Sequence, residues 1–247
     1  YQISTFLSPH YNLRDDEYGG SVENRSRLLV EVVSAIRKRC GSDFGIIVRL
    51  DGREYVEGGI TPELSAEYAV LAESAGADAI HVSASGPNSM GVGFTNGPLP
   101  WQPDQYLGLA AVVKQSVSIP VIAVGRIFPD AAEKHLKNGD CDFVSMGRQL
   151  LADPDLAAKL LSGKPDRVRT CINCFVCVAQ NFWDGAPICA VNAELGHYDE
   201  GPLRPATERR KVVVVGGGPG GMETARVAAV RGHSVTLLEK SPHLGGT

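Results

Sequence analysis

The cysteines are the residues of this sequence whose types and spacing most clearly suggest chemistry. Cys171, Cys174 and Cys177 follow one another at two-residue intervals and Cys189 comes eleven residues later, so four of the six cysteines lie within nineteen residues. No disulfide framework needs such crowding, and it is typical of iron–sulfur ligation, in which four thiolates hold one cluster. The alternatives are a zinc site, which more often uses two separated cysteine pairs, and cysteines with a purely structural role. We expect these four residues to be metal ligands.

Two Gly-Arg pairs are candidates for a phosphate site. Gly125-Arg126 and Gly147-Arg148 each follow a short apolar run. Glycine lets backbone N–H groups approach a phosphate, and arginine can bind it through two parallel hydrogen bonds. The alternative is that each arginine forms a salt bridge at a rim of the fold. Two such pairs after neighbouring strands, where barrels commonly bind phosphate, favour the phosphate site.

A glycine-rich loop near the end of the sequence indicates nucleotide binding. Gly216, Gly218 and Gly221 have the G-x-G-x-x-G spacing, and Glu239 comes 18 positions after Gly221. The first glycine permits the turn, the second permits approach of a pyrophosphate, and the third permits close packing of the helix. The acidic residue can accept hydrogen bonds from a ribose. Because the loop lies between a predicted strand and a predicted helix, we expect it to bind a dinucleotide or an adenine nucleotide, rather than to be a structural turn.

The elements that must position these residues alternate between strand and helix. Continuous apolar runs separated by amphipathic segments are typical of a parallel sheet covered by helices. The expected strands are residues 45–50, 79–83, 120–124, 143–146, 211–215 and 234–238. The expected helices are residues 22–39, 62–74, 105–115, 130–138, 153–161 and 222–231, with Ser21 as an N-cap and residues 1–27 otherwise rich in turns.

The first four strand–helix units predict half of a barrel. A closed (β/α)8 barrel needs eight strands, so we expect the other four before residue 1 and interpret the chain as an internal fragment. The predicted domains are residues 1–165 for the second half of the barrel, 166–210 for the cysteine segment and linker, and 211–247 for the start of a nucleotide-binding domain. The predicted fold class is therefore α/β.

Composition restricts the class of partner. The sequence is 43% hydrophobic and 21% charged, with a net charge of −4, which indicates a globular protein and gives no reason to expect nucleic acid or a membrane surface. No apolar run approaches the length of a membrane span. Cys40 and Cys141 stand apart from the other four cysteines, and free cysteines beside a metal-type set predict a reducing, cytoplasmic location.

Several stretches of the sequence match one enzyme family. The segment FLSPHYNLRDDEYGGSVENRSR, residues 6–27, resembles the part that follows the fourth barrel strand of old yellow enzyme relatives. The segments IIVRL, AIHVSASG, VIAVGRI and FVSMGRQLLADPDL resemble their last four strands. The cysteine motif and VVVVGGGPGG narrow the resemblance to the multidomain iron–sulfur branch, which includes 2,4-dienoyl-CoA reductases, 2-enoate reductases and trimethylamine dehydrogenase. The resemblance covers essentially the whole chain.

The resemblance implies a role for each motif. The barrel is expected to hold FMN, with Arg49 at the flavin pyrimidine ring and both Gly-Arg pairs at its phosphate. Four cysteines, Cys171, Cys174, Cys177 and Cys189, are expected to ligate a 4Fe–4S cluster. The glycine loop and Glu239 are expected to bind FAD or ADP, with residues 246–247 beginning a flavin-contacting loop. Tyr1 aligns with a family tyrosine that can donate a proton, a role that suits a hydroxyl with a pKa near 10.

The sequence departs from the family pattern at one informative place. Two residues separate Cys174 from Cys177, as in trimethylamine dehydrogenase, whereas the dienoyl-CoA reductases have three. The usual active-site pair of the fourth strand is expected before residue 1. His10 and His81 are secondary candidates for substrate or flavin contacts, because a lone histidine near a strand end is more often structural.

The resemblance therefore implies an oxidoreductase. The first interpretation is reduction of an activated C=C bond of an enoyl or dienoyl substrate, with NAD(P)H as the electron donor and electrons passing through FAD, the cluster and FMN. The second is an amine dehydrogenase that runs in the opposite direction and passes electrons to a carrier protein. A non-catalytic scaffold with a nucleotide and a structural zinc is a third possibility from another class.

Overall fold

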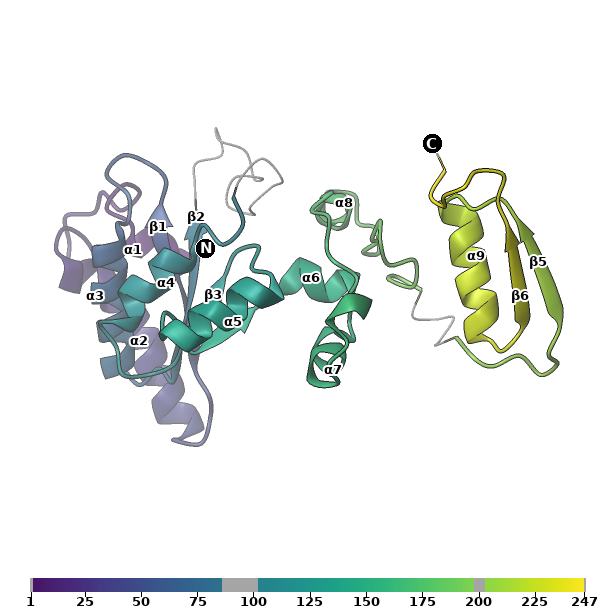
Figure 1. The fold of residues 1–247 in the computed structure, drawn as a ribbon. Helices are drawn as coiled ribbons and strands as arrows, with labels where there is room; N and C mark the ends of the chain where they lie inside the picture. The colour runs from purple at the N-terminus through teal and green to yellow at the C-terminus, as the bar shows by residue number, and fades with distance from the viewer. Residues whose placement is uncertain (1, 86–101, 198–202, 247) are drawn as a thin grey trace. The chain divides into compact units, whose positions relative to one another are not determined.

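The computed structural model describes residues 2–85, 102–197 and 203–246. Figure 1 shows the course of the chain. It divides into two compact units, Tyr1–Ala193 and Glu194–Thr247, and each is described by itself. Among the helices of the described residues, none is both long and apolar enough to cross a membrane.

The first unit is built on a parallel sheet. Its strands are β1 (Ile47–Glu54), β2 (Ala79–Ser85), β3 (Val121–Val124) and β4 (Phe143–Ser145), and they lie side by side in sequence order. The pairing is parallel throughout, with Arg49 opposite His81, Val82 opposite Ala123 and Val124 opposite Ser145. Parallel strands in this register bring their carboxyl ends to one edge of the sheet, so the residues that follow the strands lie near one another.

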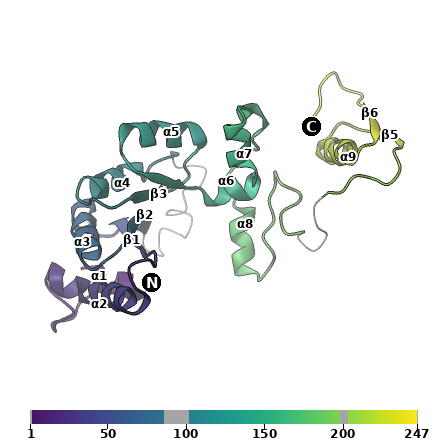
Figure 2. The same ribbon diagram turned by 90° about the horizontal axis from the view of Figure 1, so that it is seen from below.

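The helices of the first unit cover one face of this sheet. Figure 2 shows α2 to α5 along an arc on one side of the strands. Ile80 and Val82 are buried beneath them, while His81 and Ser83 of the same strand point to the other face and are partly exposed. The helices are α1 (Gln2–Leu7), α2 (Val22–Cys40), α3 (Pro62–Ser74), α4 (Leu107–Lys114), α5 (Pro129–Asn138), α6 (Gly147–Ala152), α7 (Leu156–Leu161) and α8 (Val176–Ala179), with short 3-10 helices at Pro165–Arg167 and Gln180–Phe182.

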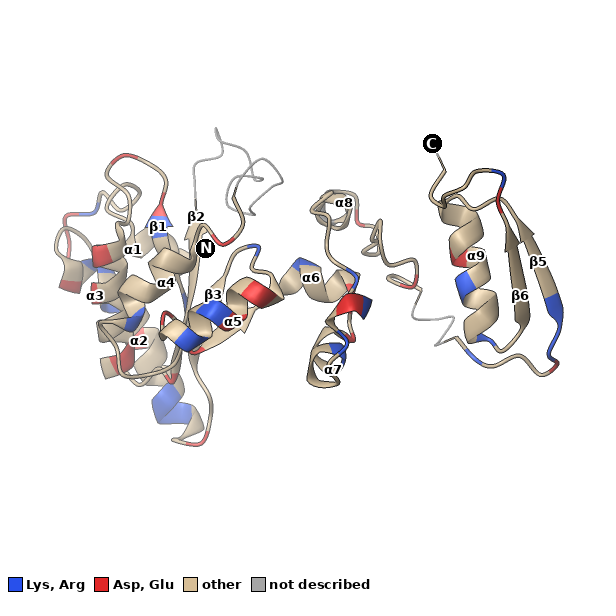
Figure 3. Cartoon of the chain, viewed as in Figure 1, with Lys and Arg blue, Asp and Glu red and all other residues tan. Residues whose placement is uncertain are grey.

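Local sequence explains where the longer helices begin. The Ser21 side chain accepts a hydrogen bond from the backbone N–H of Asn24, as predicted, and Thr61 does the same for Leu64. Pro62 follows Thr61 at the first helical position, where its missing N–H costs nothing. Figure 3 shows that acidic and basic residues are spread along the helices of the first unit. On α5, Lys137 and Glu133 form an ion pair one helical turn apart.

Two predictions about helices were wrong. Residues 1–27 were expected to be rich in turns, with no helix before Ser21, but they contain α1. The end of α1 is held because the Tyr68 hydroxyl donates to the Leu7 carbonyl over 2.6 Å. A single helix was expected over 153–161, but the chain forms α6 directly after Met146 and then α7. Asp153 separates the two helices because its backbone is extended and its carboxylate makes tertiary contacts.

The second unit contains the start of a strand–helix–strand fold. Strands β5 (Lys211–Val215) and β6 (Ser234–Leu238) pair in parallel over all five residues, at the predicted bounds. Helix α9 (Pro219–Val230) connects them and begins three residues before the predicted start, because Pro219 occupies a first-turn position. The glycine loop therefore lies between a strand and a helix.

Candidate cofactor site

One cavity of about 380 Å³ lies at the carboxyl ends of the four parallel strands. It collects residues that the sequence places more than 120 positions apart. Five of the predicted FMN residues line it, together with the first cysteine of the motif: Arg49, Gly125, Arg126, Gly147, Arg148 and Cys171. The structure therefore brings the Gly-Arg pairs that follow β3 and β4 to the same cavity as an arginine of β1.

The turn after β3 needs a glycine for two reasons. Gly125 has φ of 125°, a backbone conformation that other residues rarely adopt, and a Cβ on it would meet Cδ2 of Tyr106 at 2.4 Å. Arg126 follows with φ of 52°. This left-handed pair turns the chain across the Tyr106 ring and places Arg126 on the cavity wall. Burial raises the pKa of Tyr106 to about 12, so its hydroxyl stays protonated at neutral pH.

Arg148 connects the cavity to the cysteine segment. Its guanidinium carbon lies 4.7 Å from the centre of the Phe175 ring, a cation–π distance. Burial lowers the pKa of Arg148, while the nearby Cys171 and Cys177 favour the charged form. The ordinary pKa of arginine is so high that the side chain remains a cation at neutral pH. A phosphate in the cavity and thiolates in the cysteine segment are both groups that this charge can stabilise.

Arg49 is held on the exposed inner face of the sheet. It contacts His81 through Nη1, 3.2 Å from Nδ1, and donates through Nη2 to the Ser83 hydroxyl over 2.9 Å. Burial and the charge of Arg49 lower the pKa of His81, so the imidazole is neutral at neutral pH and can accept from the guanidinium. His81 thus supports Arg49 instead of repelling it. His10, the other secondary candidate, contacts the Glu57 carbonyl and does not line the cavity.

Asp51 is a cavity residue that was expected at the polar end of a strand but was not among the predicted site residues. It lies two residues after Arg49 on β1 and lines the same cavity. Burial raises its pKa, and the nearby Glu54 carboxylate acts in the same direction, while the Ser85 hydroxyl opposes the shift. The even spacing from Arg49 was the available signal, because residues two apart on a strand share a face.

The cysteine segment lies against this cavity at its first residues. Cys171 and Asn173 line the cavity, and the Cys171 sulfur is 3.9 Å from Oδ1 of Asn173. Asn173 and Phe175 both have left-handed backbones, with φ of 52° and 63°, so the chain coils tightly around Cys174 before α8. Burial raises the pKa of the Cys177 thiol, and the neighbouring Cys171 adds to the effect.

The four sulfurs do not meet at one point in this structure. Within residues 2–85, 102–197 and 203–246, no three Cys, His, Asp or Glu side chains are arranged as metal ligands. The types and number of donors suit an iron–sulfur cluster, and Cys171 and Cys177 lie near enough to influence each other. Joint ligation by all four cysteines stays a prediction.

The glycine loop of the second unit has the backbone that its motif predicts. Gly216 has φ of 102°, and a Cβ on Gly221 would lie 1.9 Å from the Gly216 carbonyl oxygen, so neither position accepts a larger residue without change. Gly218 caps the N-terminus of α9. Glu239 follows β6 and accepts hydrogen bonds from the backbone N–H of Ser241 and of Gly217, which lower its pKa. The acidic residue therefore lies directly at the loop.

Tyr1, the predicted proton donor, and Thr247 lie outside the described residues. Their predicted contacts with substrate and flavin therefore stay predictions.

Comparison with known proteins identifies the family. Residues 1–167 match the NADH:flavin oxidoreductase / NADH oxidase family, and residues 211–247 match the FAD-dependent oxidoreductases. The chain belongs to the NADH:flavin oxidoreductase family. This membership confirms the α/β class, the half of a TIM barrel and the start of an FAD-type nucleotide domain, while the individual residues of the FMN site stay predictions.

Relatives of this NADH:flavin oxidoreductase family member include enzymes of several activities. The metal reductase of Desulforamulus reducens is 42% identical over 100% of this chain and 37% of its own length. The N,N-dimethylglycine/sarcosine dehydrogenase of Chromohalobacter salexigens is 40% identical over 99% of this chain and 36% of its own length. A structure of 2-naphthoyl-CoA reductase in complex with 2-naphthoyl-CoA is 38% identical, with a TM-score of 0.91 over 98% of this chain and 37% of that one. The chain thus spans little more than a third of the length of these relatives.

Proposed function

We propose that this chain is part of an iron–sulfur flavoprotein that uses NAD(P)H to reduce the C=C bond of an enoyl or dienoyl substrate. The observation that carries the proposal is the single cavity that collects Arg49, two Gly-Arg pairs and Cys171. A cationic site at the strand ends suits a phosphate, and a cysteine on its wall suits a redox centre beside it. The family membership supports oxidoreductase chemistry, and the 2-naphthoyl-CoA reductase structure favours an unsaturated acyl-CoA substrate.

The residues of the cavity would divide the binding of FMN between them. Arg126 and Arg148 would bind the phosphate, with Gly125 and Gly147 allowing the backbone to approach it. Arg49, held by His81 and Ser83, would donate to the flavin pyrimidine ring. FMN, when bound, supplies hydride transfer to the substrate.

Two further groups complete the proposed cofactor set. Cys171, Cys174, Cys177 and Cys189 would ligate a 4Fe–4S cluster, which exchanges single electrons. Gly216, Gly218, Gly221 and Glu239 would bind FAD or ADP, with the glycine loop at the pyrophosphate and the carboxylate at a ribose. Such a site requires Glu239 to exchange its contact with the Gly217 N–H for one with the nucleotide.

Proton delivery to the substrate is assigned to Tyr1. A protonated tyrosine hydroxyl is a suitable general acid near neutral pH. Within the described cavity, Tyr106 also keeps its proton, but its ring is fixed beneath Gly125 and it serves to support the turn. A small-molecule substrate, a cytoplasmic location and an electron-transfer partner complete the proposal.

A second candidate function is oxidation of an amine, with electrons passed to a carrier protein. The two-residue interval between Cys174 and Cys177 favours it, because it matches the trimethylamine dehydrogenase type. The relative from Chromohalobacter salexigens, a dehydrogenase of N-methylated amines by its name, also supports this direction.

Two parallel assays on the full-length protein separate the candidates. One follows NADH and NADPH oxidation in the presence of an enoyl-CoA or a 2-enoate. The other follows reduction of an artificial dye in the presence of methylated amines. The proposal predicts substrate-dependent oxidation of a nicotinamide cofactor in the first assay and background rates in the second. Turnover with amines alone contradicts the reductase and supports the dehydrogenase.

A further inference from the structure

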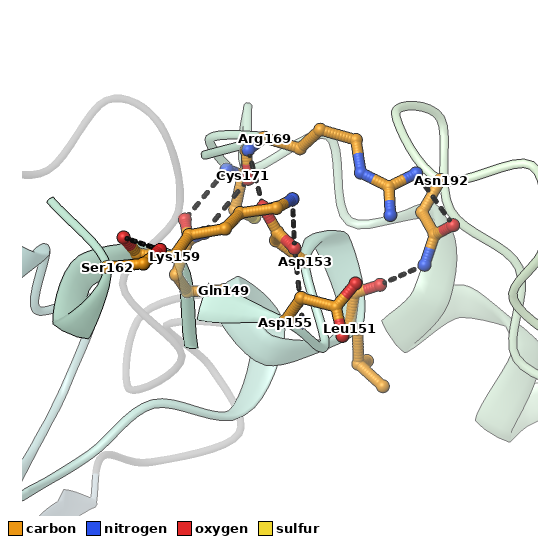
Figure 4. A network of polar contacts seen from close by, with 9 residues as sticks. All are labelled: Gln149, Leu151, Asp153, Asp155, Lys159, Ser162, Arg169, Cys171 and Asn192. Carbon is orange, nitrogen blue, oxygen red and sulfur yellow. Dashed lines mark hydrogen bonds and ion pairs between the residues drawn. The ribbon is translucent and has the colours of Figure 1, made fainter. Parts of the chain in front are cut away.

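Gln149 lies at the junction of the cavity and the cysteine segment. It is the third residue of α6, directly after the Gly147-Arg148 pair, and only 5% of its surface is exposed. Both ends of its side-chain amide are used: Oε1 accepts from the backbone N–H of Cys171 over 2.9 Å, and Nε2 donates to the Arg169 carbonyl over 2.9 Å. Figure 4 shows Gln149 reaching from α6 to this segment.

This pair of hydrogen bonds fixes the backbone on both sides of residue 170. An amide that accepts from one peptide and donates to another acts as a neighbouring strand would, since it satisfies two backbone groups in a fixed geometry. A side chain without these groups removes the partner of one partly buried N–H and one partly buried C=O, so each of the two hydrogen bonds is lost. The contact depends on backbone atoms, so it sets where Cys171 lies whatever the neighbouring side chains are.

Leu151 of α6 and Asp153, the residue that follows the helix, anchor the same segment at other points. Asp153, fully buried, accepts from the Arg169 backbone N–H over 2.8 Å and from the Lys159 ammonium over 2.6 Å. Asn192 donates to the Leu151 carbonyl over 2.8 Å and accepts from Arg169. Both the beginning and the end of the cysteine segment are thus tied to this helix, as Figure 4 shows. Within this network, the Gln149 side chain is bonded to the backbone N–H of Cys171, which is a predicted metal ligand.

We infer that Gln149 is a positioning residue that holds Cys171 on the cavity wall beside Arg148. This inference rests on the proposed function, under which Cys171 is the first ligand of the cluster. Because α6 begins with Gly147 and Arg148 on the cavity, one short helix fixes the distance between the phosphate-binding residues and the first thiolate. The amide makes this link without adding a charge beside the cluster.

The test replaces Gln149 in the full-length protein and measures the Cys171 amide. Gln149→Met keeps the length of the side chain and removes both hydrogen-bonding groups, while Gln115→Met makes the same change at an exposed position after α4. Hydrogen exchange at the Cys171 N–H is followed in the protein as isolated and again after iron removal. Loss of one hydrogen bond predicts exchange about two- to tenfold faster in Gln149→Met and unchanged in Gln115→Met.

A second measurement distinguishes positioning from a general loss of structure. Iron release to a chelator is expected to be several times faster in Gln149→Met, with bound FMN and the melting temperature near wild type and an altered paramagnetic resonance spectrum of the reduced protein. Wild-type exchange at Cys171 in a folded Gln149→Met protein overturns the inference. If that variant does not fold, Gln149→Glu takes its place, because it keeps the acceptor for the Cys171 N–H and loses only the donor to the Arg169 carbonyl. Exchange at the Cys171 N–H near the wild-type rate supports the inference, and exchange as fast as in an unfolded chain overturns it. Wild-type protein without iron contradicts the proposed function instead, and leaves the exchange result to decide on Gln149 separately.

Discussion

Replacement of Arg148 by alanine is expected to weaken FMN binding without affecting the iron content. The guanidinium lines the cavity, is partly buried, and is held at 4.7 Å from the Phe175 ring, so little ordering is needed when a phosphate binds. Alanine removes both the charge and the fork of N–H donors. The cysteine segment is expected to stay in place, because the Cys171 N–H donates to Gln149 and the Arg169 N–H donates to Asp153, and both partners remain in this variant.

The magnitude follows from the kind of contact that is lost. A charge-assisted hydrogen bond is worth about 1.5–3 kcal/mol, and each 1.4 kcal/mol corresponds to a factor of about ten in affinity. Arg148→Ala should therefore weaken FMN binding by about ten- to a hundredfold. Arg148→Lys, which keeps the charge but not the fork, should fall between wild type and alanine. Equilibrium dialysis or flavin fluorescence titration of deflavinated full-length protein measures the affinity.

Arg53→Ala is a matched control, because it also removes an arginine that stacks on an aromatic ring. Arg53 lies 5.3 Å from the Tyr55 ring and is exposed, but it does not line the cavity. Arg53→Ala is expected to leave FMN affinity within about twofold of wild type, since a surface substitution away from the site changes little. Equal FMN affinity in Arg148→Ala and wild type refutes the assignment of the phosphate site.

Three further predictions concern the metal, the turn and the buried carboxylate. Cys177→Ala should lose most of its iron and retain FMN, whereas Cys40→Ala, at an exposed cysteine outside the motif, should keep both; wild-type iron in Cys177→Ala argues against ligation. Gly125→Ala forces a residue into φ of 125° and against Tyr106, so it should reduce the free energy of unfolding by about 1–3 kcal/mol, and an unchanged denaturation midpoint contradicts this. Burial opposes ionisation of Asp153, but a lysine and backbone N–H groups hold its pKa below the usual value. A depressed pKa in the folded state stabilises above the unfolded pKa, near 4, and this stability is lost as the pH falls through the folded value. Wild type should thus lose more stability than Asp153→Asn between about pH 5 and pH 2, and parallel pH–stability curves contradict the role of Asp153.

The sheet could be predicted well from the sequence because the apolar residues that form each strand are consecutive in the sequence. Runs such as 120–124 and 212–215 are continuously apolar, and the parallel register follows once helices connect them. Helices α1 and α6 were not predicted, because the residues that stabilise them are distant in the sequence. The end of α1 is held by Tyr68, and α6 is held by contacts with residues 169–192.

Some residues of the candidate site could likewise be predicted from the sequence, and others could not. The Gly-Arg pairs could be placed together from sequence, since parallel strands end at one edge and both pairs follow strands directly. Asp51 and Gln149 were not predicted as site residues, because a role can be assigned to such common polar residues only from their contacts in the fold. The spacing of the cysteines predicts a shared metal, but among the described residues their side chains are not arranged as metal ligands, so joint ligation stays a prediction.

The most direct test of the central claim is cofactor analysis of the full-length protein. Its absorption spectrum, extracted flavins and metal content are measured on one preparation. The account predicts a flavin spectrum with broad absorption from iron and sulfide, FMN together with FAD or ADP, and about four iron atoms per chain. A colourless protein that contains zinc and no flavin contradicts it.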